Sequence, residues 1–205
     1  NFNDNDYSGI FVFSTGEINA QNITASNNTG FAGAILSNFL GNSAAVYITG
    51  TNVFNGNSDI GLGVFSDGAI YVENITANVN LSDDGINLDN ENGGSGSGDV
   101  TLNNASASNN GANGIYIFTN GNSTTNNITA NSNALNGLFV SAYGQINLNN
   151  ITANQNGFAG VNLSSNNAGV SVINGQFNNN GFGGVGGLAY GNIYIENVIS
   201  DGNDS

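Results

Sequence analysis

The sequence predicts an all-β protein, a parallel β-helix solenoid of about nine rungs with 23–30 residues in each rung. Eight segments of the 205-residue chain resemble one another at this spacing, and apolar and polar residues alternate within them. No stretch shows the 3.6-residue period of a helix. The eight segments begin at Ile18, Val46, Ile70, Val100, Ser123, Ile146, Val170 and Ile193.

Each rung is predicted to contain two strands joined by turns. The first strand opens with an alternating stretch, as in 146–149, passes an Asn, and ends in a second short alternation, as in 151–153. An Asn- and Gly-rich turn follows. The second strand opens on a glycine, as in GIYIF from Gly114, GLFV from Gly137, GVNLS from Gly160 and GVGGL from Gly184. Proline is absent, which agrees with strands that all donate to a ladder.

Parallel stacking places equivalent residues of successive rungs about 4.8 Å apart. We therefore predict a ladder of Asn side chains at one corner of the coil, buried and hydrogen-bonded from rung to rung. Asn suits a corner because it tolerates a bent, left-handed backbone better than other side chains do. The predicted ladder contains Asn22, Asn74, Asn104, Asn127, Asn150, Asn174 and Asn197.

The repeat follows the pattern N-I-T-A-N and then N-G-x-x-G-[IV]-x-[LV], most clearly over residues 150–163. This pattern covers essentially the whole chain. It resembles the right-handed parallel β-helix repeats of the pectate-lyase-like superfamily, most of all the Asn- and Gly-rich versions found in microbial surface proteins and adhesins. The resemblance implies a right-handed coil. It does not define an activity, because the superfamily contains lyases, hydrolases, phage tailspikes and inert stalks.

The composition excludes several partners. The formal net charge is −14, with no Lys, Arg or His, so nucleic acid and anionic lipid would be repelled. The absence of cysteine excludes disulfides and thiol chemistry. No apolar stretch approaches the roughly 20 residues of a membrane span, so we expect no membrane insertion.

The repeat pattern indicates one domain over residues 1–205 that starts and ends within a rung. We expect this domain to be a segment of a longer solenoid or a subunit that stacks end to end, because an open rung exposes strand edges that invite pairing. The expected partner is therefore further repeats of the same protein.

The residue types restrict catalysis, and the expectation is that the chain is not an enzyme. Without His, Lys, Arg or Cys, Ser-His, Cys-His and Schiff-base chemistry are excluded, and a lyase would lack its base. A carboxylate pair remains open, but Glu73 and Glu196 lie five rungs apart, about 24 Å. Asp83 with Asp84, or Asp89 with Glu91, could approach each other. No cofactor is required on this interpretation.

Calcium is the candidate ion. Asp59 and Asp83 occupy the same position in successive units, and so do Asp67 and Glu91. Carboxylates about 5 Å apart on adjacent rungs would offer oxygen ligands to Ca²⁺. The alternative, which we favour, is that these are solvated carboxylates in turns.

The resemblance and composition together favour a structural, adhesive role as a rigid extracellular fibre, stalk or surface layer. The alternative is a carbohydrate-binding or carboxylate-dependent glycan-cleaving β-helix, with exposed tyrosines stacking on a surface glycan. The candidate tyrosines are Tyr47, Tyr71, Tyr116 and Tyr194. A third, weaker alternative is an ice-binding face built on the outward column Thr24, Thr76, Ser106, Thr129 and Thr152.

Overall fold

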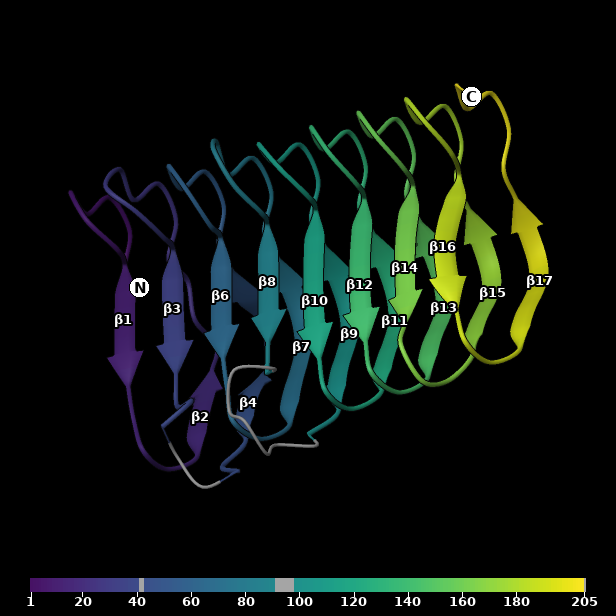
Figure 1. Ribbon diagram of the computed structural model, residues 1–205. Helices are drawn as coiled ribbons and strands as arrows, with labels where there is room; N and C mark the ends of the chain where they lie inside the picture. Colours follow the sequence, from purple (N-terminus) through teal and green to yellow (C-terminus); the bar gives the residue numbers. More distant parts are fainter. Residues whose placement is uncertain (41–42, 91–97, 205) are drawn as a thin grey trace.

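The computed structural model describes residues 1–40, 43–90 and 98–204. These residues form a right-handed parallel β-helix of about eight turns, with two sheets facing each other and the two termini at opposite ends of the stack (Figure 1). The predicted fold class is therefore confirmed, and the coil is close to the nine rungs expected. Among the described residues there is no helix long and apolar enough to cross a membrane.

One sheet, sheet A, contains the glycine-led strands in the order β1-β3-β6-β8-β10-β12-β14-β16. Its strands are β1 (Ile10–Phe13), β3 (Ala34–Ser37), β6 (Leu62–Phe65), β8 (Ile86–Asp89), β10 (Ile115–Thr119), β12 (Leu138–Ala142), β14 (Val161–Ser165) and β16 (Val185–Ala189).

The second sheet, sheet B, has the order β17-β15-β13-β11-β9-β7-β4-β2, and the short strand β5 pairs with β7 beside this path. Its strands are β2 (Ile18–Gln21), β4 (Val46–Thr49), β5 (Asn52–Val53), β7 (Ile70–Thr76), β9 (Val100–Ser106), β11 (Ser123–Thr129), β13 (Ile146–Thr152), β15 (Val170–Gln176) and β17 (Ile193–Ile199).

The register follows the sequence repeat. All strand pairs are parallel, and the first residues of the eight segments pair with one another, from Ile18 with Val46 to Val170 with Ile193. This agreement arises because a shift by one residue would move every apolar side chain from the interior to the surface.

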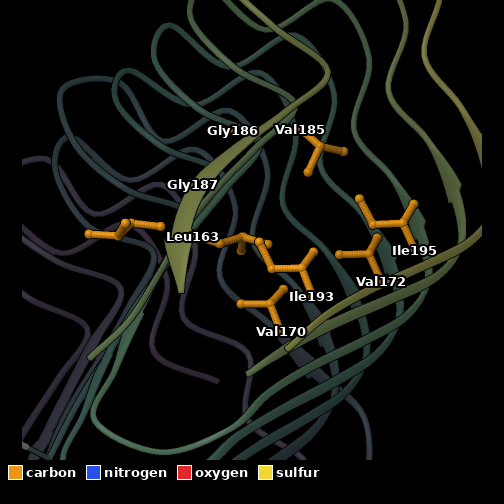
Figure 2. A pocket seen from close by; sticks show the side chains of 9 residues that line it. Leu163, Val170, Val172, Val185, Gly186, Gly187, Ile193 and Ile195 are labelled. Carbon is orange, nitrogen blue, oxygen red and sulfur yellow. The ribbon is translucent and has the colours of Figure 1, made fainter. Parts of the chain in front are cut away.

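The main hydrophobic core runs through the coil and is formed by the inward residues of both sheets, and a smaller cluster contains Ala32, Ile35 and Ile60. In β13, for example, Ile146 and Leu148 are buried, while Asn147 is half-buried and Asn149 exposed. Figure 2 shows the end of the coil at the last turns, where buried Val170 and Val172 and exposed Ile193 and Ile195 line a hollow of about 160 Å³.

The glycine that opens each sheet A strand is required by close packing. At Gly114, a Cβ would lie 2.5 Å from the carbonyl oxygen of Ala107 and 2.6 Å from the side-chain nitrogen of Asn133. Backbone and an amide from the next rung therefore occupy the space that any larger residue needs.

Candidate functional site

The outer face of sheet B is the most regular polar surface of the coil. Alternate residues of each strand point outward and lie in register on successive rungs, forming two parallel columns. We call these two columns the sheet B face. The first column contains Tyr47, Tyr71, Thr101, Thr124, Asn147, Ser171 and Tyr194, and the second contains Glu73, Asn103, Asn126, Asn149, Ile173 and Glu196.

Two tyrosine–glutamate pairs bracket this face. The Tyr71 hydroxyl donates a hydrogen bond to Oε2 of Glu73 at 2.8 Å, and the Tyr194 hydroxyl donates in the same way to Oε2 of Glu196. The pairs form because residues two apart in a strand point to the same side. The rings of Tyr47 and Tyr71 extend the first pair, with centroids 6.4 Å apart.

The hydrogen bond within each tyrosine–glutamate pair shifts the pKa of the tyrosine. The bond to Glu73, followed by burial, raises the pKa of the Tyr71 phenol, and a hydrogen bond with Asn103 opposes this shift. The bond to Glu196 likewise raises the pKa of Tyr194. Both tyrosines therefore remain hydroxyl donors that orient their glutamates.

Amide side chains occupy the centre of the face. Asn126 Nδ2 donates to Oδ1 of Asn103 at 2.9 Å. Beside this column, the seven asparagines predicted as a ladder form one edge of the face, and we call them the corner ladder. Most of their amides bond from rung to rung, for example from Asn127 to Asn104 at 3.0 Å and from Asn150 to Asn127 at 2.8 Å. The row is interrupted twice, because Asn22 accepts from the backbone N–H of Thr51 and Asn174 donates to Asn149.

The corner ladder departs from prediction in one respect, because it is not buried. Six of its members are exposed and Asn74 is half-buried. All seven have φ between 52° and 57°. The left-handed backbone breaks the alternation of the strand, so two successive side chains, such as Asn126 and Asn127, point outward at the bend. The corner amide therefore faces solvent, and the following residue, such as Ile128, enters the core.

A second ladder was missed at the sequence level. The inner ladder is buried over most of its length. Each of its asparagines except the last, Asn203, donates to the next rung through both its backbone N–H and its Nδ2. Asn110, for example, donates both bonds to Oδ1 of Asn133, at 2.9 and 3.1 Å. Its members are Asn5, Asn28, Asn57, Asn80, Asn110, Asn133, Asn156, Asn180 and Asn203. The recurring Asn four or five residues before the strand-opening glycine was the available signal.

The predicted calcium residues lie away from this face. Asp59 and Asp83 interact across adjacent rungs, since burial and then the Asp83 charge raise the pKa of Asp59. Asp67 is half-buried with one oxygen that has no hydrogen-bond partner, and Glu91 lies outside the described residues. Within residues 1–40, 43–90 and 98–204, no three His, Cys, Asp or Glu side chains are grouped to hold a metal ion. Calcium binding therefore stays a prediction.

Asp84, next to Asp83, is a strongly perturbed carboxyl group. It is 4% exposed, and its Oδ1 accepts hydrogen bonds from the backbone N–H and Nδ2 of Asn113 at 2.8 and 2.9 Å. Burial raises its pKa to about 6, against the opposing effect of the Asn113 bonds. Asp84 therefore serves as an acceptor within the stack.

The outer face of sheet A differs in chemistry. An apolar hollow of about 300 Å³ lies on its first rungs and is lined by Phe11, Phe13, Phe31, Ile35, Phe39 and Phe65. Further along, the rings of Tyr116 and Phe139 stack face to face with centroids 5.0 Å apart. Tyr116 therefore lies on the opposite sheet from the other three tyrosines selected from the sequence.

The threonine column is also less regular than expected. Thr76, Ser106, Thr129 and Thr152 lie in register, but Val53 lies between Thr24 and Thr76. An apolar residue therefore interrupts the column that an ice-binding face would need.

No protein-family model matches the chain, and no curated protein matches it. Among solved structures, the chain is similar to a point mutant of the periplasmic alginate epimerase AlgG, with a TM-score of 0.62 and 12% identity over 89% of this chain. The unmutated AlgG structure matches at a TM-score of 0.49 and 14% identity over 83% of this chain and 42% of AlgG. The chain spans about half of the mutant structure's length, 49%.

At this identity the likeness shows the parallel β-helix fold. It also corrects one prediction. We expected a chain that is not an enzyme, and that prediction is wrong on this comparison, because a solved structure with this coil is an epimerase. The chain lacks the side chains used in familiar acid–base catalysis, but the coil itself is a scaffold on which enzymes are built.

Proposed function

We propose that the protein is a carbohydrate-binding β-helix that holds an extended glycan along the sheet B face. The observation that carries this proposal is the array of amide and hydroxyl groups repeated on successive rungs between the Tyr71–Glu73 and Tyr194–Glu196 pairs.

The chemistry of the face suits sugar hydroxyl groups. An asparagine side chain offers two donors and an acceptor, and a threonine hydroxyl offers both functions, so each rung can exchange hydrogen bonds with a hydroxyl in either sense. Tyr47 and Tyr71 add apolar ring surface next to these polar groups, which is the usual composition of a binding site for an organic ligand.

The geometry suits a polymer better than a single sugar. The face is turned toward solvent, with most of its side chains half-buried by their neighbours, and it repeats about every 4.8 Å along the coil. An extended glycan aligned with the coil axis would meet equivalent groups at successive sugars, and many weak contacts on one chain raise the overall affinity.

The comparison with solved structures supports the same substrate class. AlgG is named as an alginate epimerase, so a coil of this kind works on a polysaccharide in that protein. Because AlgG is also named as periplasmic, we infer that this chain functions outside the cytoplasm, attached to or acting on a glycan-covered surface.

The test is binding of immobilised neutral and charged glycans by surface plasmon resonance. We expect Tyr71→Ala to weaken binding about tenfold, equivalent to about 1.4 kcal/mol. Tyr116→Ala is the matched control, since it removes an outward tyrosine from sheet A. Two results would reject the proposal: no binding to any glycan by the native chain, or an equal loss for both variants when thermal melts show that both are folded.

A further inference from the structure

The charge of the sheet B face restricts the kind of glycan that it can hold. The chain has 14 acidic residues and no Lys, Arg or His, so no side chain can neutralise a carboxylate on a bound sugar. Like charges at a protein surface repel one another, and salt screens this repulsion only in part. A polymer of uronic acids would therefore be repelled by this face, with no cation to offset the repulsion.

The charges on the face itself are all negative and lie at defined places. Glu73 and Glu196 are the charged members of the second column, and the residues between them are three asparagines and Ile173. The two carboxylates are five rungs apart, about 24 Å at the spacing of parallel strands. Asp99, exposed just before β9, adds a carboxylate at the border of the same sheet.

Each glutamate is also prepared for a cation. Its tyrosine donates a hydrogen bond to Oε2, which fixes the direction of the carboxylate. Charge-assisted hydrogen bonds from an ammonium group to a carboxylate are among the stronger polar contacts, and an aromatic ring nearby also attracts a cation. Tyr71, with Tyr47 beside it, supplies such rings at the first pair.

We propose that the glycan held by the sheet B face is a cationic polymer of amino sugars, with ammonium groups at Glu73 and Glu196 and neutral sugars or hydroxyl groups over the asparagines between them. This inference rests on the proposed function and names its ligand class. It separates this chain from AlgG, whose named substrate, alginate, is a polymer of uronic acids.

The experiment compares three oligosaccharides of equal length by isothermal titration calorimetry: a deacetylated glucosamine polymer, its fully N-acetylated counterpart, and alginate. The pH is one at which the free amines are protonated, and each titration is repeated at low and high salt. We expect the amino polymer to bind at least about tenfold more tightly than the N-acetylated form. Alginate is expected to show no binding, and the preference is expected to shrink as salt rises.

Two double variants with the same change in net charge locate the effect. Glu73→Gln with Glu196→Gln removes the two carboxylates but keeps the shape of the side chains, and we expect it to reduce binding of the amino polymer to the N-acetylated level. Asp4→Asn with Asp6→Asn removes two exposed charges from the N-terminal turn, and it is expected to leave the preference unchanged.

The outcomes distinguish the two proposals. If none of the three polymers nor any other glycan binds, the proposed function is wrong. If the N-acetylated form or alginate binds as tightly as the amino polymer, the ligand class is wrong while carbohydrate binding stands. If both double variants weaken binding equally, the attraction belongs to the overall charge, and the assignment to Glu73 and Glu196 is overturned.

Discussion

The corner ladder and the inner ladder use the same side chain in opposite surroundings. Asn127 in the corner ladder is exposed and has a φ of 57°, and it bonds to asparagines on both neighbouring rungs. Asn133 in the inner ladder is 2% exposed and bonds both to its neighbours in the ladder and to the carbonyl oxygen of Ala107. A repeated asparagine can therefore serve one ladder by tolerating a left-handed backbone and the other by pairing its buried amide.

The largest expected effect is the loss of a buried amide. Asn133→Ala would leave the backbone N–H and Nδ2 of Asn110 without their acceptor and remove a donor to Ala107. Because buried polar groups without partners are costly, we expect a loss of about 4 kcal/mol in the free energy of unfolding. Urea denaturation followed by circular dichroism measures this loss.

The matched comparison is Asn127→Ala, at the exposed corner. Water can replace the two lost hydrogen bonds there, so the main cost is an alanine in a left-handed conformation, and we expect about 2 kcal/mol. Asn127→Gly should cost less than the alanine change. Equal losses at Asn133 and Asn127 would contradict the distinction between the two ladders.

The next effect concerns Asp84, where a carboxylate takes the place of an amide in a short run with Asn113 and Asn136. The folded pKa of about 6 lies above the ordinary value of 3.8, so the folded state holds its proton more tightly than the unfolded state. Stability should therefore fall as pH rises from about 4 to about 6, by up to about 3 kcal/mol, and then stay level.

Asp84→Asn should remove most of this pH dependence and stabilise the protein at neutral pH, and a smaller part remains with Asp59, whose pKa is also raised. Asp99→Asn is the control, because Asp99 accepts the same pair of bonds from Asn122, at 2.8 and 3.1 Å, while it is exposed. Urea denaturation at a series of pH values measures both variants. A native chain whose stability rises between pH 4 and 6, or an unchanged slope in Asp84→Asn, would contradict the assignment.

The smallest effect is a gain at Val79, which lies just before Asn80 of the inner ladder. Val79 has a φ of 61°. Several equivalent positions on other rungs, such as Asn27, Gly56 and Asn109, hold residues that tolerate this conformation better, and two hold Ser132 and Gln155. We expect Val79→Asn to raise stability by about 1 kcal/mol. Val79→Ala keeps a Cβ in the left-handed region and should gain less, and thermal melts of both variants measure the difference.

The fold of the coil could be predicted from the sequence because the alternation of apolar and polar residues repeats in every rung. Alternation places Ile146 and Leu148 inside and fixes the register of every neighbour, so the fold class and the pairing of the eight segments could be predicted. The burial of the corner ladder could not, because alternation does not show that a left-handed residue at Asn127 turns its side chain outward.

The candidate functional site could be predicted only in part from the sequence. Tyr71 and Tyr194 were selected as exposed aromatics, but their pairing with Glu73 and Glu196 emerges only when two residues of one strand are placed on the same outer face. The inner ladder was missed because an Asn in a turn, such as Asn133, is read as a turn former before it is read as a buried amide.

The direction of the hydrogen bonds in the two ladders has a consequence for the electrical asymmetry of the coil. In the inner ladder the amides before Asn203 donate toward the C-terminal rungs, as Asn133 does to Asn156, whereas in the corner ladder Asn127 donates back toward Asn104. The amide dipoles of the two rows therefore oppose each other along the axis. As turns are added, a stack built in this way accumulates a smaller macroscopic dipole than a single row of aligned amides would create.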